Sequence, residues 1–351
     1  AFAPKDAYDV VAAPVYYDYQ ALGEARFGDH ALRLFGYGSS DRIELLLAEP
    51  SPEDPALRGE TAVGIAFHRI SARLDSQLDE AVKQRLQLTY GVVDGTQNIA
   101  GTNAAFFQHD VFGRADWTAT IAPALSLRTG LDVAAFVLDG RYDGERPPQL
   151  EGDPGLGGPG TSRSRVSLDD VVRSFQPAAY VEIGVRPLPP LLLLPSARVD
   201  YFDAIDHVAV DPRFAARLEV ARDLTVKAGV GLFTQPPLYF ESMPALGNPE
   251  LVPIRAVQTS AGAEVSLFED AVALDLEGYY KRLDDRVVAT EGREAPFFDN
   301  DGDGRIFGAE ASLRTSFAER FTGWLAYSMA RSERRDRGGD YRLFDEDQTH
   351  S

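Results

Sequence analysis

The residues whose spacing best suits a metal ion run from position 299 to position 310. This stretch, DNDGDGRIFGAE, places oxygen-bearing side chains at its first, third, fifth and twelfth positions, with a glycine at the sixth. An EF-hand loop supplies calcium with oxygens at this spacing. An EF-hand is flanked by helices, however, and here both flanks alternate like strands. We therefore treat Asp299, Asp301 and Asp303 as candidate ligands of a weak calcium site, and we expect no high-affinity binding.

Two other stretches invite a chemical interpretation. Asp284 and Asp285 could form a carboxylate pair for acid–base catalysis, but adjacent residues of a strand point to opposite faces, so the sequence predicts that they diverge. The segment GNPELVP (residues 247–253) is either a ligand loop or the cap of a strand end. Its prolines force extended backbone and favour the cap.

The chain carries no recognisable catalytic or cofactor motif. It lacks the GxSxG elbow, the P-loop, the dinucleotide fingerprint and HExxH. We therefore predict that the protein is not an enzyme and holds no resident cofactor other than the weak calcium site. An enzyme with catalytic residues dispersed along the chain is the alternative.

The composition narrows the class of protein further. The 351 residues carry a formal net charge of −19, which argues against nucleic acid as a partner because phosphate binding needs a basic surface. There are no cysteines and only five histidines, so a thiolate metal site is impossible and a histidine cage is not expected. With 44% hydrophobic residues, the chain can form a large buried or lipid-facing surface.

Alternation with a period of two dominates the sequence. In residues 224–233 one face carries Leu224, Val226, Ala228, Val230 and Leu232, and the other carries Thr225, Lys227, Gly229, Gly231 and Phe233. Because successive side chains of a strand point to opposite sides, such a strand has one apolar wall and one polar or small wall. About fifteen segments can be interpreted in this way. They predict a sheet whose two faces meet different surroundings.

The connections predict which surroundings these are. Short turns at Gly28-Asp29, Pro123-Ala124 and Arg222-Asp223 alternate with longer loops, above all residues 139–170, as in outer-membrane barrels. Residues 74–84 form a connection too long for this pattern, and residues 94–110 are expected to be mostly loop. No run reaches the ~18 apolar residues of a transmembrane helix, so contact with a membrane requires a closed β-barrel. The predicted fold is all-β, an antiparallel transmembrane β-barrel.

Several segments, in their order, resemble the barrel of a TonB-dependent outer-membrane receptor. They are LTVKAGVGLFTQPP, GNPELVPIRAVQTSAGAE, LEGYYKRLDDRVV, NDGDGRIFGAEASLR, GWLAYSMARSERRD and YRLFDEDQTH, all within the last third of the chain or close to it. The resemblance implies a barrel of about 22 strands with a plugged lumen, of which residues 1–351 would supply about 15 strands. Neither a plug domain, nor a TonB box, nor a signal peptide is recognisable, so we expect a partial barrel.

The resemblance also implies a function and a location. It implies active uptake of a scarce nutrient across the outer membrane, of the iron-siderophore, cobalamin or glycan class, with energy supplied through the TonB complex. The expected partners are outer-membrane lipid, TonB and a small nutrient ligand. A passive porin and a soluble all-β binding module or carbohydrate-acting enzyme are the alternatives. Strands longer than the five or six residues usual in a sandwich favour the barrel.

Overall fold

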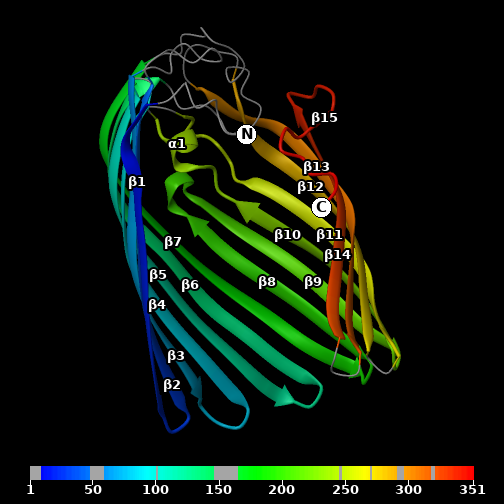
Figure 1. Ribbon diagram of the computed structural model, residues 1–351. Coiled ribbons are helices and arrows are strands. Elements are labelled where there is room, and N and C mark those ends of the chain that lie inside the picture. The colour runs from blue at the N-terminus through cyan, green and yellow to red at the C-terminus, as the bar shows by residue number, and fades with distance from the viewer. Residues whose placement is uncertain are drawn as a thin grey trace. The chain divides into compact units, whose positions relative to one another are not determined.

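The structure is a computed structural model that describes residues 9–47, 59–99, 102–145, 165–244, 247–268, 271–290, 296–317 and 321–351. The described residues form fifteen strands, almost all of them long (Figure 1). The strands are β1 (Asp9–Phe27), β2 (His30–Leu47), β3 (Gly59–Gln77), β4 (Val82–Ile99), β5 (Thr102–Ala122), β6 (Leu125–Glu145), β7 (Arg165–Leu188), β8 (Leu191–Phe202), β9 (His207–Ala221), β10 (Leu224–Gln235), β11 (Ile254–Leu267), β12 (Val272–Ala289), β13 (Phe298–Phe317), β14 (Phe321–Asp336) and β15 (Arg342–Leu343).

Each strand is hydrogen-bonded to its neighbours in chain order, from β1 to β15. Neighbouring strands pair in antiparallel orientation, as in β2 with β3 and β12 with β13. The chain divides into two compact units: residues 1–117 with 131–177, and residues 118–130 with 178–351. We call these the first and second unit. The all-β class, the antiparallel pairing and the strand number predicted from the sequence are confirmed.

Tight turns join the strands where the sequence predicts them. Gly28, with a φ of 55°, lies in the turn between β1 and β2, a backbone conformation that glycine adopts without steric cost. The turns at Pro123-Ala124 and Arg222-Asp223 also join consecutive strands. Each predicted short turn therefore positions a long hairpin.

Three predicted boundaries differ from the structure. Residues 74–84 are not a long connection, because β3 continues to Gln77 and β4 begins at Val82. Residues 94–110 are not mostly loop, because β4 runs to Ile99 and β5 begins at Thr102. Of the predicted loop 139–170, the first residues belong to β6 and the last to β7, and residues 146–164 lie outside the described part. In all three places the strand continues where its residues no longer alternate between apolar and polar.

Helix is almost absent from the described residues. It consists of the 3-10 turn η2 (Asp203–Ile205) and the short helix α1 (Tyr239–Ser242) in the connection between β10 and β11. In the described part of the chain no helix has the length and apolar character needed to cross a membrane.

The described residues have almost no buried core. No side chain among them is less than 2% exposed, and the one buried hydrophobic cluster found there consists of Leu251, Val287 and Phe298. A soluble domain of this size would bury most of its large apolar side chains. Here many of them lie on the strand surfaces instead, so the sheet is built to have its apolar face covered by something other than the described protein.

Candidate functional site

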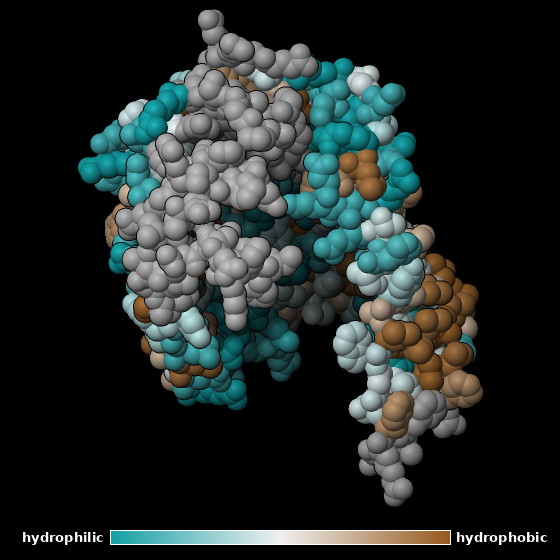
Figure 2. All heavy atoms as spheres, turned by 45° about the horizontal axis from the view of Figure 1, so that its top comes forward, coloured by the Kyte–Doolittle hydropathy of each residue, from teal (hydrophilic) through white to brown (hydrophobic). Residues whose placement is uncertain are grey.

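The apolar face of the second unit is continuous across its strands. Val230 of β10, Leu276 of β12, and Leu325 and Met329 of β14 all expose more than two fifths of their surface. In Figure 2 hydrophobic residues gather in one band over the strands that Figure 1 colours orange and red, with hydrophilic residues beyond it. A contiguous apolar face of this kind is suited to hydrocarbon, not to water.

Aromatic residues lie on both faces of these strands. Tyr280 and Phe307 lie directly opposite each other on β12 and β13, on the apolar face, where interfacial aromatic residues are expected. Trp324, by contrast, lies opposite Arg314, on the polar face of β14. Trp324 therefore lies on the face of β14 opposite to the apolar band.

The polar face of the second unit carries a ladder of ion pairs across four strands. Arg217 of β9 holds Glu264 of β11 through two hydrogen bonds of 2.9 and 2.6 Å. Lys227 of β10 contacts Asp275 at 2.8 Å and Glu277 at 3.2 Å, both on β12. We call these five residues the charge ladder. Because Lys227 reaches acids two strands away, the ladder fixes the register of four strands on the polar side.

A glycine makes the longest of these contacts possible. On β11, Gly262 lies between Lys227 of β10 and Glu277 of β12 in register. A Cβ at Gly262 would meet the Cε of Lys227 at 3.0 Å. The aliphatic part of the Lys227 side chain therefore crosses β11 at Gly262, where no side chain blocks its path. The sequence places Lys227 on the polar wall but does not predict the ladder. The signal that could have indicated the ladder is a charged residue at a polar-facing position in each of the four strands.

The first unit repeats this pattern on its polar face. Glu24 of β1 accepts hydrogen bonds from Arg26 and from Arg33 of β2. Asp75 of β3 bonds both Arg73 and Arg85 at 2.7 Å. Since each acid is matched by arginines on its own or a neighbouring strand, this wall offers water and ligands both signs of charge at close spacing.

The connection between β10 and β11 is tied down onto the β12–β13 hairpin. Asn248 donates from Nδ2 to the carbonyl of Phe298 at 3.0 Å, and Leu251 packs in the buried cluster with Phe298. Asn300 accepts from the backbone N–H of Val252 at 2.9 Å and donates to the carbonyls of Val252 and Asp285. GNPELVP is thus anchored to other strands at both Asn248 and Val252, and its interpretation as a strand-end segment is supported by these contacts.

Burial changes the acidity of one group in this connection. The carboxylate of Glu241 is buried and accepts one hydrogen bond, 2.7 Å long, from the N–H of Leu238. Burial raises the pKa of Glu241 above its ordinary 4.5, although the bond from Leu238 acts in the opposite direction. The folded connection therefore holds the proton more tightly than the unfolded chain does.

We expect the β10–β11 connection to lose stability as the pH rises through the raised pKa of Glu241. A raised pKa means that the folded state gains stability below 4.5 and loses it when the carboxylate ionises. Hydrogen-exchange protection of the amides of Gly247 and Asn248, corrected for intrinsic exchange, should fall over this range. Glu241→Gln keeps an acceptor for Leu238 and should make the protection independent of pH; an unchanged pH dependence in this variant contradicts the assignment.

The predicted calcium ligands lie within β13, not in a loop between helices. Asp299 is paired with Arg337 at 2.9 Å, and Asp303 with Arg335 at 2.6 Å. Asp301 accepts a hydrogen bond at its backbone carbonyl from Arg337 N–H. Glu310 is seven residues beyond Asp303 on the same strand, about 23 Å away. Within the described ranges no group of three or more His, Cys, Asp or Glu side chains is arranged to hold a metal ion.

The calcium site therefore stays a prediction with a defined test. Because arginines neutralise two of the three carboxylates, calorimetric titration of the refolded protein with calcium is expected to show no high-affinity site. Asp301→Ala should leave the titration unchanged. Submillimolar binding that disappears in Asp301→Ala would show that the aspartates bind the ion despite their arginine partners.

The paired aspartates of β12 depart from simple alternation. A β-bulge lies between Leu283 and Arg286, and Asp285 has a φ of 60°. Both Asp284 and Asp285 therefore line one groove, and the prediction that they point to opposite faces is wrong. Asp284 bonds Arg282 at 2.8 Å and Asp285 bonds Arg255 at 2.8 Å, so each carboxylate is bound to its own arginine.

Comparison with protein families assigns most of the chain to one domain type. Residues 15–348 match the family model described as TonB dependent receptor-like, beta-barrel. A comparison with curated protein sequences finds no match.

Three solved structures illustrate the structural similarity. The ferric-catecholate import receptor Fiu from K12 E. coli, in its closed form, is similar with a TM-score of 0.67 at 9% identity, over 92% of this chain and 58% of that one. P. aeruginosa FpvA, in an iron complex with a heterologous pyoverdine, gives 0.69 at 12% identity, over 93% and 50%. The copper transporter OprC gives 0.65 at 13% identity, over 93% and 55%. The chain thus spans 50–58% of the length of these proteins, and the likeness shows a shared fold.

Proposed function

This chain belongs to the TonB-dependent receptor family, as part of its outer-membrane β-barrel, and from that premise we propose that it forms the wall of a nutrient importer. The observation that carries the proposal is the contrast between the two faces of the same strands. One face of β9 to β12 is apolar and exposed, and the other carries the charge ladder of Arg217, Lys227, Glu264, Asp275 and Glu277. A wall of this kind separates hydrocarbon from a polar lumen.

The proposed cargo is a scarce nutrient of the iron-siderophore, cobalamin or glycan class. Iron-siderophores come first for testing, because two similar structures are a ferric-catecholate import receptor and a receptor bound to an iron pyoverdine. The copper transporter among the similar structures shows that this fold carries other cargo as well. A polar wall with both signs of charge, such as the Glu24 and Asp75 clusters, suits a polar or charged ligand over an apolar one.

We further propose that import is energised through the TonB complex, and this part rests on family membership. A passive porin is the second candidate, since its wall would also carry an apolar and a polar face. The two candidates differ in energy dependence: an energised importer accumulates its ligand against a gradient, whereas a porin equilibrates it.

The test uses the complete receptor in a Gram-negative host that lacks its own uptake routes. Cells should take up labelled ferric siderophore, cobalamin or glycan at nanomolar supply, and uptake should stop on deletion of TonB or addition of a protonophore. Uptake that persists without TonB would identify a porin. Receptor that fractionates away from the outer membrane would contradict both candidates.

A further inference from the structure

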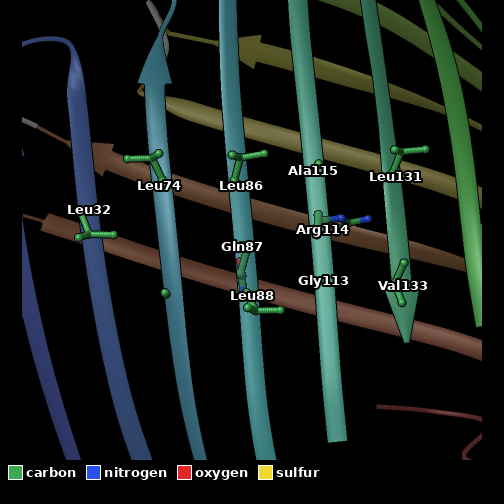
Figure 3. Close-up of a pocket in the computed structure, with 11 residues that line it drawn as sticks. Leu32, Leu74, Leu86, Gln87, Leu88, Gly113, Arg114, Ala115, Leu131 and Val133 are labelled. Carbon is green, nitrogen blue, oxygen red and sulfur yellow. The ribbon is translucent and has the colours of Figure 1, made fainter. Parts of the chain in front are cut away.

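The polar face of the first unit carries an arginine that crosses a neighbouring strand. Figure 3 shows the opposite, apolar face, where Leu86 and Leu88 of β4 line a hollow together with Leu131 of β6. Gly91 of β4 alternates with the two leucines of its strand, and Arg69 of β3 lies directly opposite it in register. Because successive residues of a strand point to opposite sides, Arg69 and Gly91 both belong to the polar face.

The side chain of Arg69 passes over Gly91 toward β5. A Cβ at Gly91 would lie 2.9 Å from the Cγ of Arg69, so any larger residue would block this path. The Cζ of Arg69 lies 5.6 Å from the centre of the Phe67 ring, and its Nη2 lies 3.9 Å from Oδ2 of Asp110 on β5. We call these four residues the first arginine site.

The guanidinium of this site keeps hydrogen-bonding capacity. A charge-assisted bond from arginine to a carboxylate is about 2.7–2.9 Å long, so the 3.9 Å contact with Asp110 is an ion pair without such a bond. Asp110 instead accepts a bond of 2.6 Å from Gln108, and within the described part of the chain Nε of Arg69 has no partner. The Arg69 side chain is 34% exposed and that of Asp110 only 4%, so a ligand at this wall meets the positive member of the pair.

The second unit repeats this arrangement on its own polar face. Arg213 of β9 lies opposite Gly231 of β10, where a Cβ would again lie 2.9 Å from the arginine Cγ. The Cζ of Arg213 lies 4.1 Å from the centre of the Phe233 ring, and its Nη2 lies 3.5 Å from Oδ2 of Asp211. Asp211 is nearly buried and accepts bonds from the backbone N–H and the hydroxyl of Thr234. We call Asp211, Arg213, Gly231 and Phe233 the second arginine site.

The two sites lie at the same level along their strands. Arg69 is eight residues from Gln77, where β3 ends at a short turn, and Arg213 is eight residues from Ala221, where β9 ends at a tight turn. Eight residues span about 26 Å along a strand. The apolar band of outer-membrane barrels is about 25 Å tall, and their tight turns face the periplasm. Each site therefore lies in the outer half of the wall, which a ligand from outside reaches first.

Each site presents a guanidinium beside an aromatic ring. The guanidinium is a planar fork of donors that matches a pair of anionic oxygens. The ring offers a flat apolar face for stacking, and Phe233 is 37% exposed. A neutral ligand leaves the charge of the guanidinium unused, and an anion without rings leaves the phenylalanine unused. The pair is best matched by negative charge carried on aromatic groups.

We propose that the two arginine sites select an anionic cargo with aromatic groups of the catecholate type, and that Arg69 and Arg213 are specificity-determining residues. The anionic oxygens of the cargo accept hydrogen bonds from the guanidinium, and its rings stack on Phe67 or Phe233. This inference rests on the proposed import function and narrows its iron-chelate class.

Four substitutions separate the role of the charge from the role of the ring. They are Arg69→Gln and Arg213→Gln, which remove a guanidinium, and Phe67→Leu and Phe233→Leu, which remove a ring. The controls make the same changes on the outward face, with Arg282→Gln on β12 and Phe307→Leu on β13. Arg282 is two residues beyond Tyr280 on that face, and Phe307 lies opposite Tyr280. Heat-modifiable migration on gels verifies that each variant is folded.

The measurement is equilibrium dialysis of the purified complete receptor, without TonB, against three radioiron-labelled probes. These are a ferric tris-catecholate chelate, ferric citrate and a neutral ferric trihydroxamate chelate. Wild type should bind the tris-catecholate most tightly. Each arginine variant should raise the Kd of both anionic probes about tenfold, the effect of losing one charge-assisted hydrogen bond. Each phenylalanine variant should weaken binding of the tris-catecholate alone, and both controls should match wild type.

Three results would overturn the inference: no binding of the tris-catecholate by folded wild type, equal affinity for the neutral and the anionic chelates, or unchanged affinity in both folded arginine variants. Each concerns binding alone and leaves energised import intact. Uptake that persists without TonB contradicts energised import and leaves these affinities unchanged, so the two failures are distinguishable.

Discussion

Replacing Leu276 with arginine is expected to destabilise the folded receptor by about 2–4 kcal/mol, the cost of a charge on the lipid face near the bilayer midplane. Leu276 is exposed on the apolar face of β12, with Ala263 and Ala311 beside it in register. Leu276, Gly278 and Tyr280 are successive residues on the apolar face of β12. Tyr280 marks the border of the apolar band, so Leu276 lies within the band. An arginine there has neither water nor a carboxylate within the sheet's apolar face.

The matched control places the same charge on the other face of the same hairpin. Ser312 of β13 lies directly opposite Asp275, in the charge ladder. Ser312→Arg should therefore fold with little loss, because the new guanidinium meets a carboxylate in polar surroundings. The measurement is urea titration of the complete receptor in lipid vesicles, followed by heat-modifiable migration. Equal destabilisation by both substitutions would show that the two faces have been assigned incorrectly.

The sequence predicted well the features that follow from hydrocarbon on one face of the sheet and water on the other, above all the alternation of apolar and polar residues. Along β10 the alternation of Val226, Ala228 and Val230 with Lys227 and its neighbours follows from hydrocarbon on one side and water on the other. The same rule fails where the strand leaves the apolar band. Residues 94–99 of β4 and 102–110 of β5 do not alternate between apolar and polar types, so their composition resembles a loop although their backbone continues as strand.

The contacts of the site could not be predicted in the same way. The charge ladder joins residues of β9, β10, β11 and β12, and Lys227 reaches Asp275, 48 positions further along the chain, only because register aligns them across Gly262. The aspartates of β13 show the reverse case. Their spacing suggested calcium. The positive charge comes instead from Arg335, on the neighbouring strand β14, and from Arg337, the residue directly after that strand. The spacing of carboxylates within one segment reveals potential metal ligands, but the residues on the neighbouring strand determine whether a metal ion or a basic side chain balances their charge.

Replacing Gly247 with alanine is expected to detach the connection between β10 and β11 from its support. A Cβ at Gly247 would overlap the backbone carbonyl of Glu241 and lie 2.7 Å from the carbonyl oxygen of Phe240. These are main-chain atoms of α1 and cannot turn aside as a flexible side chain can. Either the connection shifts, or α1 does, and the hydrogen bonds from Gly247 to Met243 (2.7 Å) and from Asn248 to Glu241 (2.6 Å) are lost.

The expected cost is about 3 kcal/mol, the upper range for forcing extra atoms into a filled site. Since 1.4 kcal/mol corresponds to a factor of ten, hydrogen-exchange protection of the amides of Asn248 and Val252 should fall about a hundredfold. Gly278→Ala is the control, because the nearest atom to its Cβ would be the carbonyl oxygen of Gly308 at 3.9 Å, and its protection should match wild type. Undiminished protection in Gly247→Ala would mean that α1 and GNPELVP are held by Leu251 and Asn300 alone. A hundredfold loss would instead make the close approach of Gly247 to α1 a condition for the whole anchored segment.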